Sequence, residues 1–398
     1  MKAEINISSK NIYNLFYQNF MTSSHKDSSE LSQQDLLKLS EIFKYGRSEK
    51  HFINYLDNNK LTYFSDYESL KNLSDLRTLK SFQIIEASIK ILQLFDKNKI
   101  NCIPLKGSQL IFFYNQNPSI RPLRDLDLLI NKSQIDDAVG LLLQNGFFFK
   151  SNKDIKKGLE SSLNPGGYDI EPLVNDEGVC IEVHYKIFKD IKCSMSEIMW
   201  EESKKSCISS QININRMLPE ILSLHFIYHA TSKQGFDVGV QAFFDLYHIF
   251  SQEGFNFKKL LAISNQINLL EETSIFIRIF EKYKKFSFEP EVLDNLYQLD
   301  DETLEECIKL LIINNANNDS IKIFRYGFFN LFKKNFQRNT LDGETFYKKN
   351  KLQYINIFAR RFNRNIYKYI PIFYKLITHK SFLNDNLKTA HILRKIKK

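Results

Sequence analysis

The apolar residues of this chain recur with two different periods, and the change between them divides the sequence into three parts. Over residues 34–46 and 76–100 they follow a three- and four-residue spacing, which predicts amphipathic helices. The segment 56–75 has the composition of a linker with short helical pieces. Residues 1–97 are therefore expected to form an N-terminal helical region.

The period shortens after residue 97, and turn residues separate short apolar runs. In chain order the expected elements are a strand at 101–105, a glycine turn and short helix at 106–117, a strand at 123–130, a helix at 131–147, a strand from 147, and two strands around the turn 175–178. Ser133 is the predicted N-cap of the second helix. Residues 98–192 are expected to form a small α/β core.

From about residue 194 the helical period returns, so residues 193–398 are expected to form a larger C-terminal helical region. The predicted fold class is α+β, in which a small α/β core is flanked by helical regions on both sides.

The net charge of +9 is unevenly distributed. Residues 333–398 carry 17 basic and three acidic residues, net +14, whereas the rest carries 38 basic and 43 acidic residues, net −5. A tail this basic favours an acidic partner such as nucleic acid or an anionic surface. A solvated helical surface explains the same charge.

Cysteine content and hydropathy exclude several classes of protein. The five cysteines include no CxxC pair, which argues against a disulfide framework or a zinc ribbon. The N-terminus lacks the apolar core of a signal peptide, and no run of 18 apolar residues predicts a transmembrane segment. A cytoplasmic protein is expected.

Asp125 and Asp127 lie in an apolar strand and share one face, because side chains alternate along a strand. Leu126, Leu128 and Ile130 face the other way, toward a core. Two carboxylates on one face suit Mg²⁺, which takes oxygen ligands and substrate phosphates. Two exposed acids on an edge strand would give the same spacing.

Basic residues lie close to this pair in the sequence. Lys106-Gly107-Ser108 connects a strand to a helix, a setting that suits phosphate binding but that is also an ordinary tight connection. The second glycine of a P-loop is missing, which argues against a Walker-type NTPase. Arg121 and Arg124 match phosphate oxygens, or else neutralise the aspartates.

A third carboxylate, Glu182, interrupts a later apolar strand, and His184 shares its face. Beside the aspartates it would complete a two-cation site for displacement at phosphorus. A hairpin residue paired with Lys186 is the alternative. His225 and His229 share a helix face and, with His184, Asp245 or His248, contain metal-ligand types, although packing histidines explain them equally.

The stretch 103–130, with its Lys-Gly turn, Arg and Asp-x-Asp-Leu-Leu, and the later stretch 181–188, with Glu-x-His-Tyr, resemble the uncharacterised nucleotidyltransferase family. This family is a branch of the polymerase-β-like nucleotidyltransferase superfamily. The resemblance covers about Ile103 to Phe188, and it is looser over the flanking helices.

The resemblance implies an Mg²⁺- or Mn²⁺-dependent enzyme that moves an NMP from an NTP such as ATP to an acceptor hydroxyl. It implies metal-binding and catalytic roles for Asp125, Asp127 and Glu182, the last being aspartate in better-known members. It implies nucleotide-binding roles for Lys106, Gly107, Ser108, Arg121 and Arg124.

The acceptor class stays open among RNA, protein, sugar and small molecule. The competing hypotheses are a non-catalytic scaffold with the same fold and an RNA-binding protein that acts through its basic tail.

Overall fold

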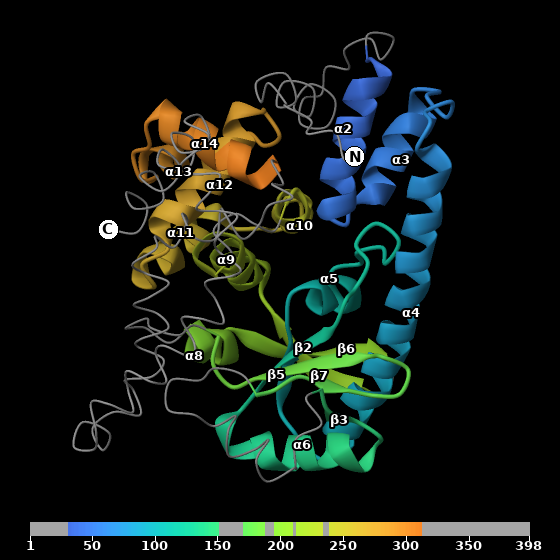
Figure 1. Cartoon of the computed structure of the whole chain (residues 1–398). Coiled ribbons are helices and arrows are strands. Elements are labelled where there is room, and N and C mark those ends of the chain that lie inside the picture. The colour runs from blue at the N-terminus through green and yellow to red at the C-terminus, as the bar shows by residue number, and fades with distance from the viewer. Residues whose placement is uncertain (1–30, 151–169, 188–194, 210–211, 234–238, 313–398) are drawn as a thin grey trace, which may run out of the picture. The chain divides into compact units, whose positions relative to one another are not determined.

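The computed structural model describes residues 31–150, 170–187, 195–209, 212–233 and 239–312 (Figure 1). All of them belong to the first of two compact units, Met1–Ile313. The second unit, Asn314–Lys398, contains the basic tail and lies outside the described residues. The prediction that this tail binds an acidic partner therefore stays a prediction.

Three helices precede the sheet: α2 (Gln33–Tyr45), α3 (Glu49–Asn58) and α4 (Tyr67–Lys97). Ser32 begins α2, because its hydroxyl oxygen accepts a hydrogen bond from the Asp35 backbone N–H. The predicted helical character is confirmed over these spans. Helix α4 begins nine residues before the predicted start at Leu76, so most of the expected linker is helical.

A five-stranded mixed sheet forms the centre, in the order β1-β2-β5-β4-β3. Strands β2 and β5 are parallel, and the other pairs are antiparallel. The strands are β1 (Cys102–Pro104), β2 (Leu126–Ile130), β3 (Phe148–Phe149), β4 (Leu173–Val174) and β5 (Cys180–His184). Since β2 lies between β1 and β5, the alternative that the aspartates sit on an edge strand is wrong.

Two helices connect the first strands: α5 (Gly107–Phe113) follows β1, and α6 (Ile135–Gln144) follows β2. A 3₁₀ turn, η3 (Lys132–Gln134), precedes α6. Its cap is Asn131, whose side-chain oxygen accepts hydrogen bonds from the backbone N–H and the hydroxyl of Ser133. The predicted N-cap role of Ser133 is therefore wrong, because Ser133 lies within this turn and Gln134 is the residue that precedes α6.

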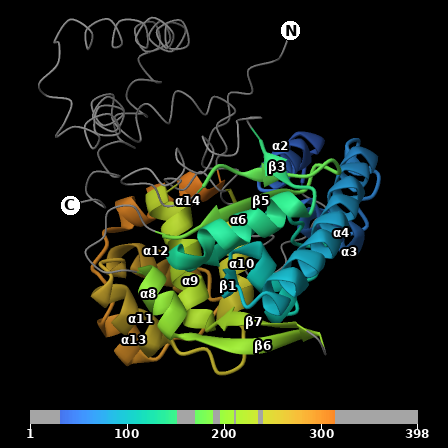
Figure 2. The ribbon, with the colours of Figure 1, turned by 90° about the horizontal axis from the view of Figure 1, so that it is seen from below.

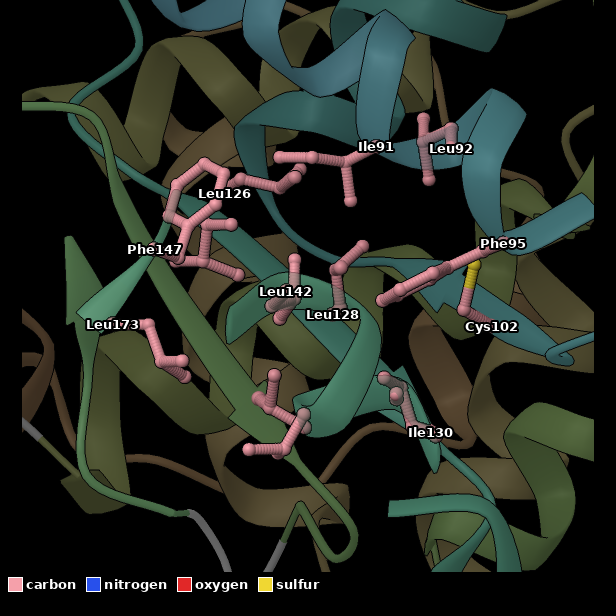
Figure 3. Close-up of a cluster of buried hydrophobic side chains, with 14 of the residues drawn as sticks. Ile91, Leu92, Phe95, Cys102, Leu126, Leu128, Ile130, Leu142, Phe147 and Leu173 are labelled. Atoms are coloured by element: carbon pink, nitrogen blue, oxygen red, sulfur yellow. The ribbon is translucent and has the colours of Figure 1, made fainter. Parts of the chain in front are cut away.

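One face of the sheet builds the core. Leu126, Leu128 and Ile130 point into a cluster with side chains of α4 and α6, such as Phe95 and Leu142 (Figure 3). Helices α4 and α6 contact each other, and Figure 2 shows both from below. The alternation predicted for β2 is confirmed, and it leaves Asp127 on the opposite face.

A second, two-stranded sheet lies where the sequence predicts only helices. After α8 (Met195–Glu201), β6 (Ser203–Ser209) and β7 (Ile212–Met217) form an antiparallel hairpin. Ile212 and Ile214 pack in the core cluster, and the Asn215 amide donates to the Cys102 carbonyl at 3.2 Å. The helical interpretation of this stretch is wrong, because β6 is too polar to show strand alternation.

The remaining described chain is helical, as predicted. It contains α9 (Pro219–Tyr228) with a π turn η4 (His229–Lys233), α10 (Gln241–Phe250), α11 (Phe257–Gln266), α12 (Leu270–Lys282), α13 (Pro290–Asp294) and α14 (Asp301–Ile312). None of the helices within the described ranges has the length and apolar character to cross a bilayer. The α+β fold class is confirmed, and the boundaries predicted at residues 97 and 192 stay predictions.

Candidate functional site

The turn between β1 and α5 has an unusual backbone. Lys106 adopts φ 51° and ψ −126°, a region that residues with a side chain rarely occupy. The Ser108 hydroxyl donates to the Leu105 carbonyl at 2.6 Å and is buried. A Cβ atom on Gly107 would lie 2.6 Å from Arg121 Nη1, so a side chain here would force the Arg121 guanidinium to move. The turn therefore fixes where the Lys106 side chain begins.

Strands β2 and β5 bring the acidic side chains together. Asp127 pairs with Glu182 and Leu129 with His184 in the parallel register, so all four side chains share one face. Asp127 is 3% exposed, whereas the side chain of Glu182 is 31% exposed. A buried carboxylate and a half-buried carboxylate thus lie side by side at the sheet surface.

Lys106 and His184 both contact Asp127. Lys106 Nζ lies 2.6 Å from Asp127 Oδ1, and His184 Nε2 lies 3.0 Å from the same oxygen. His184 Nε2 is also 3.6 Å from Glu182 Oε2. The ligand-type atoms of Asp127, Glu182 and His184 all lie within 4.8 Å of one another, a spacing that one cation can bridge.

The surroundings shift the pKa of Asp127 in the opposite direction from the pKa values of Glu182 and Asp125. Burial opposes the charge of Asp127, but Lys106 and His184 outweigh it and hold the pKa of Asp127 well below its usual value. Burial and the charge of Asp127 raise the pKa of Glu182 and of Asp125. Burial also opposes the charge of Lys106, yet Asp127 raises the pKa of that ammonium above its usual value.

Asp125 lies just before β2, with a side chain that is 24% exposed. Among the described residues, the group whose ligand atoms are close enough to share one metal ion consists of Asp127, Glu182 and His184 and does not include Asp125. The sequence pattern pairs the two aspartates, whereas the structure brings His184 closer to Asp127. In the sequence, His184 lies two residues after Glu182 and so shares its strand face, which was the signal that His184 belongs to this group.

The two arginines have different environments. Arg121 donates from Nε and Nη2 to the two carboxylate oxygens of Asp245, both at 3.2 Å. Arg124 has a side chain that is 69% exposed, and its Nε lies 4.0 Å from Asp125 Oδ2. Sequence reasoning did not anticipate the pairing of Arg121 with Asp245, which are 124 positions apart.

A small pocket lies next to the Lys106–Asp127 contact. It is lined by Leu105, Lys106, His184, Ile187, His225, Tyr228 and His229. His225 is buried, and within the described ranges its Nδ1 has no hydrogen-bond partner. His248 lies elsewhere, since its Nε2 is 2.7 Å from the Tyr114 carbonyl. Of the histidines considered from the sequence, the pocket gathers His184, His225 and His229.

A strand–turn–helix that presents Lys106, followed by parallel strands with facing carboxylates, agrees with the arrangement expected of a nucleotidyltransferase domain. Residues 64–283 match the model of the family described as uncharacterised nucleotidyltransferase, and the chain belongs to that family. A comparison with curated protein sequences gave no match.

Proposed function

We propose that this protein is a divalent-cation-dependent nucleotidyltransferase that moves an NMP from an NTP, with ATP as the first candidate, to an acceptor hydroxyl. The acceptor oxygen forms a bond to the α-phosphorus, the bond from the α-phosphorus to the bridging oxygen breaks, and pyrophosphate leaves. One observation carries the proposal: Asp127 and Glu182 face each other in register on neighbouring parallel strands.

The donor set fits Mg²⁺ or Mn²⁺. Asp125, Asp127 and Glu182 offer carboxylate oxygens, the ligands that both ions take, and His184 adds a nitrogen that suits Mn²⁺ better than Mg²⁺. A bound cation of this kind neutralises charge on phosphate oxygens. Glu182, the more exposed member of the facing pair, is the candidate to accept the proton of the acceptor hydroxyl.

The residues expected to bind the nucleotide divide into two groups in this proposal. Lys106 and Arg124 supply positive charge toward the phosphates. Gly107, Ser108 and Arg121 shape the turn that fixes Lys106, because the Ser108 hydroxyl and the Arg121 guanidinium already bind groups of the protein.

The test is transfer of label from α-labelled NTPs, with Mg²⁺ or Mn²⁺, over panels of RNAs, proteins, sugars and small molecules. Wild-type protein should transfer label. The Asp127→Asn and Glu182→Gln variants should lose at least a hundredfold of the rate, a typical effect of removing a group that stabilises the transition state. Full activity in the Asp127→Asn protein would refute the proposed site.

A non-catalytic scaffold is the second candidate, and the Lys106–Asp127 ion pair favours it. An ammonium 2.6 Å from the buried carboxylate supplies the positive charge that a cation would otherwise bring. In a scaffold, wild-type protein should transfer no label, and Mn²⁺ should not bind to it at millimolar concentration. The prediction of RNA binding through residues 333–398 lies outside the described residues.

A further inference from the structure

A second group of charged side chains lies between the N-terminal helices and the turn before β2. The charges of Arg77, Arg121 and Arg124 all act on Arg47, and we call these four residues the arginine cluster. Arg77 pairs with the buried carboxylate of Glu49. Arg121 pairs with Asp245, as described above. Arg47 forms no ion pair with a carboxylate among the described residues, and Arg124 has only the 4.0 Å contact with Asp125 on a side chain that is 69% exposed.

A chain of hydrogen bonds connects the corner that carries Arg47 to Arg121. The Ser48 hydroxyl donates to Gln241 Oε1 at 3.0 Å, and Gln241 Nε2 donates to Asp245 Oδ1 at 2.8 Å. Asp245 in turn accepts from Arg121. The corner between α2 and α3 is thereby held against the first turn of α10, the helix that binds Arg121.

Backbone contacts hold the same corner. A Cβ atom on Gly46 would lie 2.8 Å from Val240 Cγ2, and one on Gly239 would lie 3.1 Å from the Gly46 Cα. A side chain at residue 46 or 239 would therefore force its neighbours to shift, and Gly239 also has the positive φ of 68° that favours glycine. This packing fixes the position of Arg47 relative to α10.

Arg47 itself has unsatisfied hydrogen-bonding capacity. Its Nε is buried and has no hydrogen-bond partner in the part of the chain that the structure describes. Burial, together with the charges of Arg77 and Arg124, lowers the pKa of Arg47 to about 10. A buried donor and an excess of positive charge over the single carboxylate of Glu49 both favour an anion at this place.

Two members of the arginine cluster are neighbours of the proposed active site. Arg124 directly precedes Asp125 in the chain. The Arg121 guanidinium packs against Gly107, which follows Lys106. The charges of Arg121 and Arg124 act both on Asp125 and on Arg47, so these arginines connect the carboxylates electrostatically with Arg47. Arginine is suited to binding a phosphate chain because its planar fork binds two phosphate oxygens.

We propose that Arg47 and Arg124 form a subsite for the terminal phosphates of the nucleotide, so that the N-terminal helices complete the active site. The inference rests on the proposed function for the identity of the ligand. Arg47 precedes the family match at residues 64–283, so the match does not assign it. Phosphates of a nucleic-acid acceptor are the alternative that the test separates.

The test uses the positive φ of Arg47, 54°, a conformation in which glycine is unstrained. Arg47→Gly removes the side chain and leaves the backbone conformation at least as favourable. Lys60→Gly is the matched control, because Lys60 has φ 55° at the other end of α3 and is exposed. Arg47→Asn is the second variant, since asparagine also tolerates this conformation.

The probe is inorganic tripolyphosphate, titrated calorimetrically into full-length protein in EDTA at fixed ionic strength. Arg47→Gly and Arg47→Asn should weaken binding about tenfold, and Lys60→Gly should change it less than twofold. Thermal unfolding of each variant checks the fold. Equal affinities for wild type and both Arg47 variants, or equal losses in the Lys60 control, would overturn the proposal.

The subsite and the proposed function fail in different ways. If tripolyphosphate binds through Arg47 but no NMP is transferred, the subsite stands and the transferase activity does not. If NMP is transferred and Arg47→Gly changes neither tripolyphosphate affinity nor the KM for NTP, the subsite is refuted and the activity stands. Loss of RNA binding alone in Arg47→Gly would reassign the arginines to the acceptor.

Discussion

The contact between Lys106 and Asp127 makes a quantitative prediction about stability. Nζ and Oδ1 are 2.6 Å apart, and the side chains are only 18% and 4% exposed. Replacing Asp127 by asparagine leaves the Lys106 ammonium with little water and with only the weaker effect of the Asp125 and Glu182 charges. Replacing Lys106 by methionine leaves the Asp127 carboxylate with His184 as its remaining partner.

Removing one partner of a buried ion pair typically costs about 3–5 kcal/mol of the free energy of unfolding. His184 and residual exposure moderate the loss, so we expect ~3 kcal/mol for each single variant. The Lys106→Met/Asp127→Asn double variant should cost less than the sum of the singles, with a coupling energy of roughly 2 kcal/mol.

Urea unfolding followed by fluorescence of Trp200, the single tryptophan, measures these differences. The control is the ion pair of Lys90 and Glu86, whose atoms are 2.7 Å apart but whose side chains are 71% and 70% exposed. The Lys90→Met and Glu86→Gln variants should couple by less than about 0.5 kcal/mol. Equal coupling in the two cycles would contradict the argument that burial makes the Lys106 pair strong.

Three further outcomes follow from particular contacts. Gly107→Ala places a Cβ 2.6 Å from the Arg121 guanidinium and should destabilise the fold by about 2 kcal/mol. Gly140→Ala, in α6, meets nothing within 4 Å and should stabilise the fold by about 0.5 kcal/mol. Urea unfolding midpoints measure both changes. Burial lowers the pKa of His51 to about 4, so the unfolded chain binds a proton between pH 6.5 and 4 that the folded protein does not. Stability should fall by up to about 3 kcal/mol as the pH drops through this window, and His51→Gln should flatten the fall; an unchanged slope would exclude His51 as the cause. His184→Ala should weaken Mn²⁺ binding at least tenfold and Mg²⁺ binding by much less, measured by paramagnetic resonance with Mg²⁺ competition, and equal losses would mean that the imidazole only orients Asp127.

The family match supports the resemblance seen in the sequence, but sequence reasoning was uneven across the fold. The hydrophobic period predicted the helical regions on both sides of the core and the five strands of the main sheet, but not the individual helices α3, α8, α11 and α13. It missed the β6–β7 hairpin, because β6 is polar and its partner β7 is defined by packing against β1 and α4. Local pattern also gave Ser133 the wrong role, since the side chain of Asn131 competes for the same turn.

By itself, the sequence predicted that Asp125 and Asp127 point the same way and that Glu182 and His184 share one face of a later strand, because alternation is a local property of strands. The tertiary structure decided that Asp127 faces Glu182, since strand register depends on pairing between segments 55 residues apart. It also decided that Lys106 contacts Asp127, that Arg121 contacts Asp245, and that Arg47 lies in the same arginine cluster as Arg124. Such contacts depend on how distant elements pack, which no local spacing encodes.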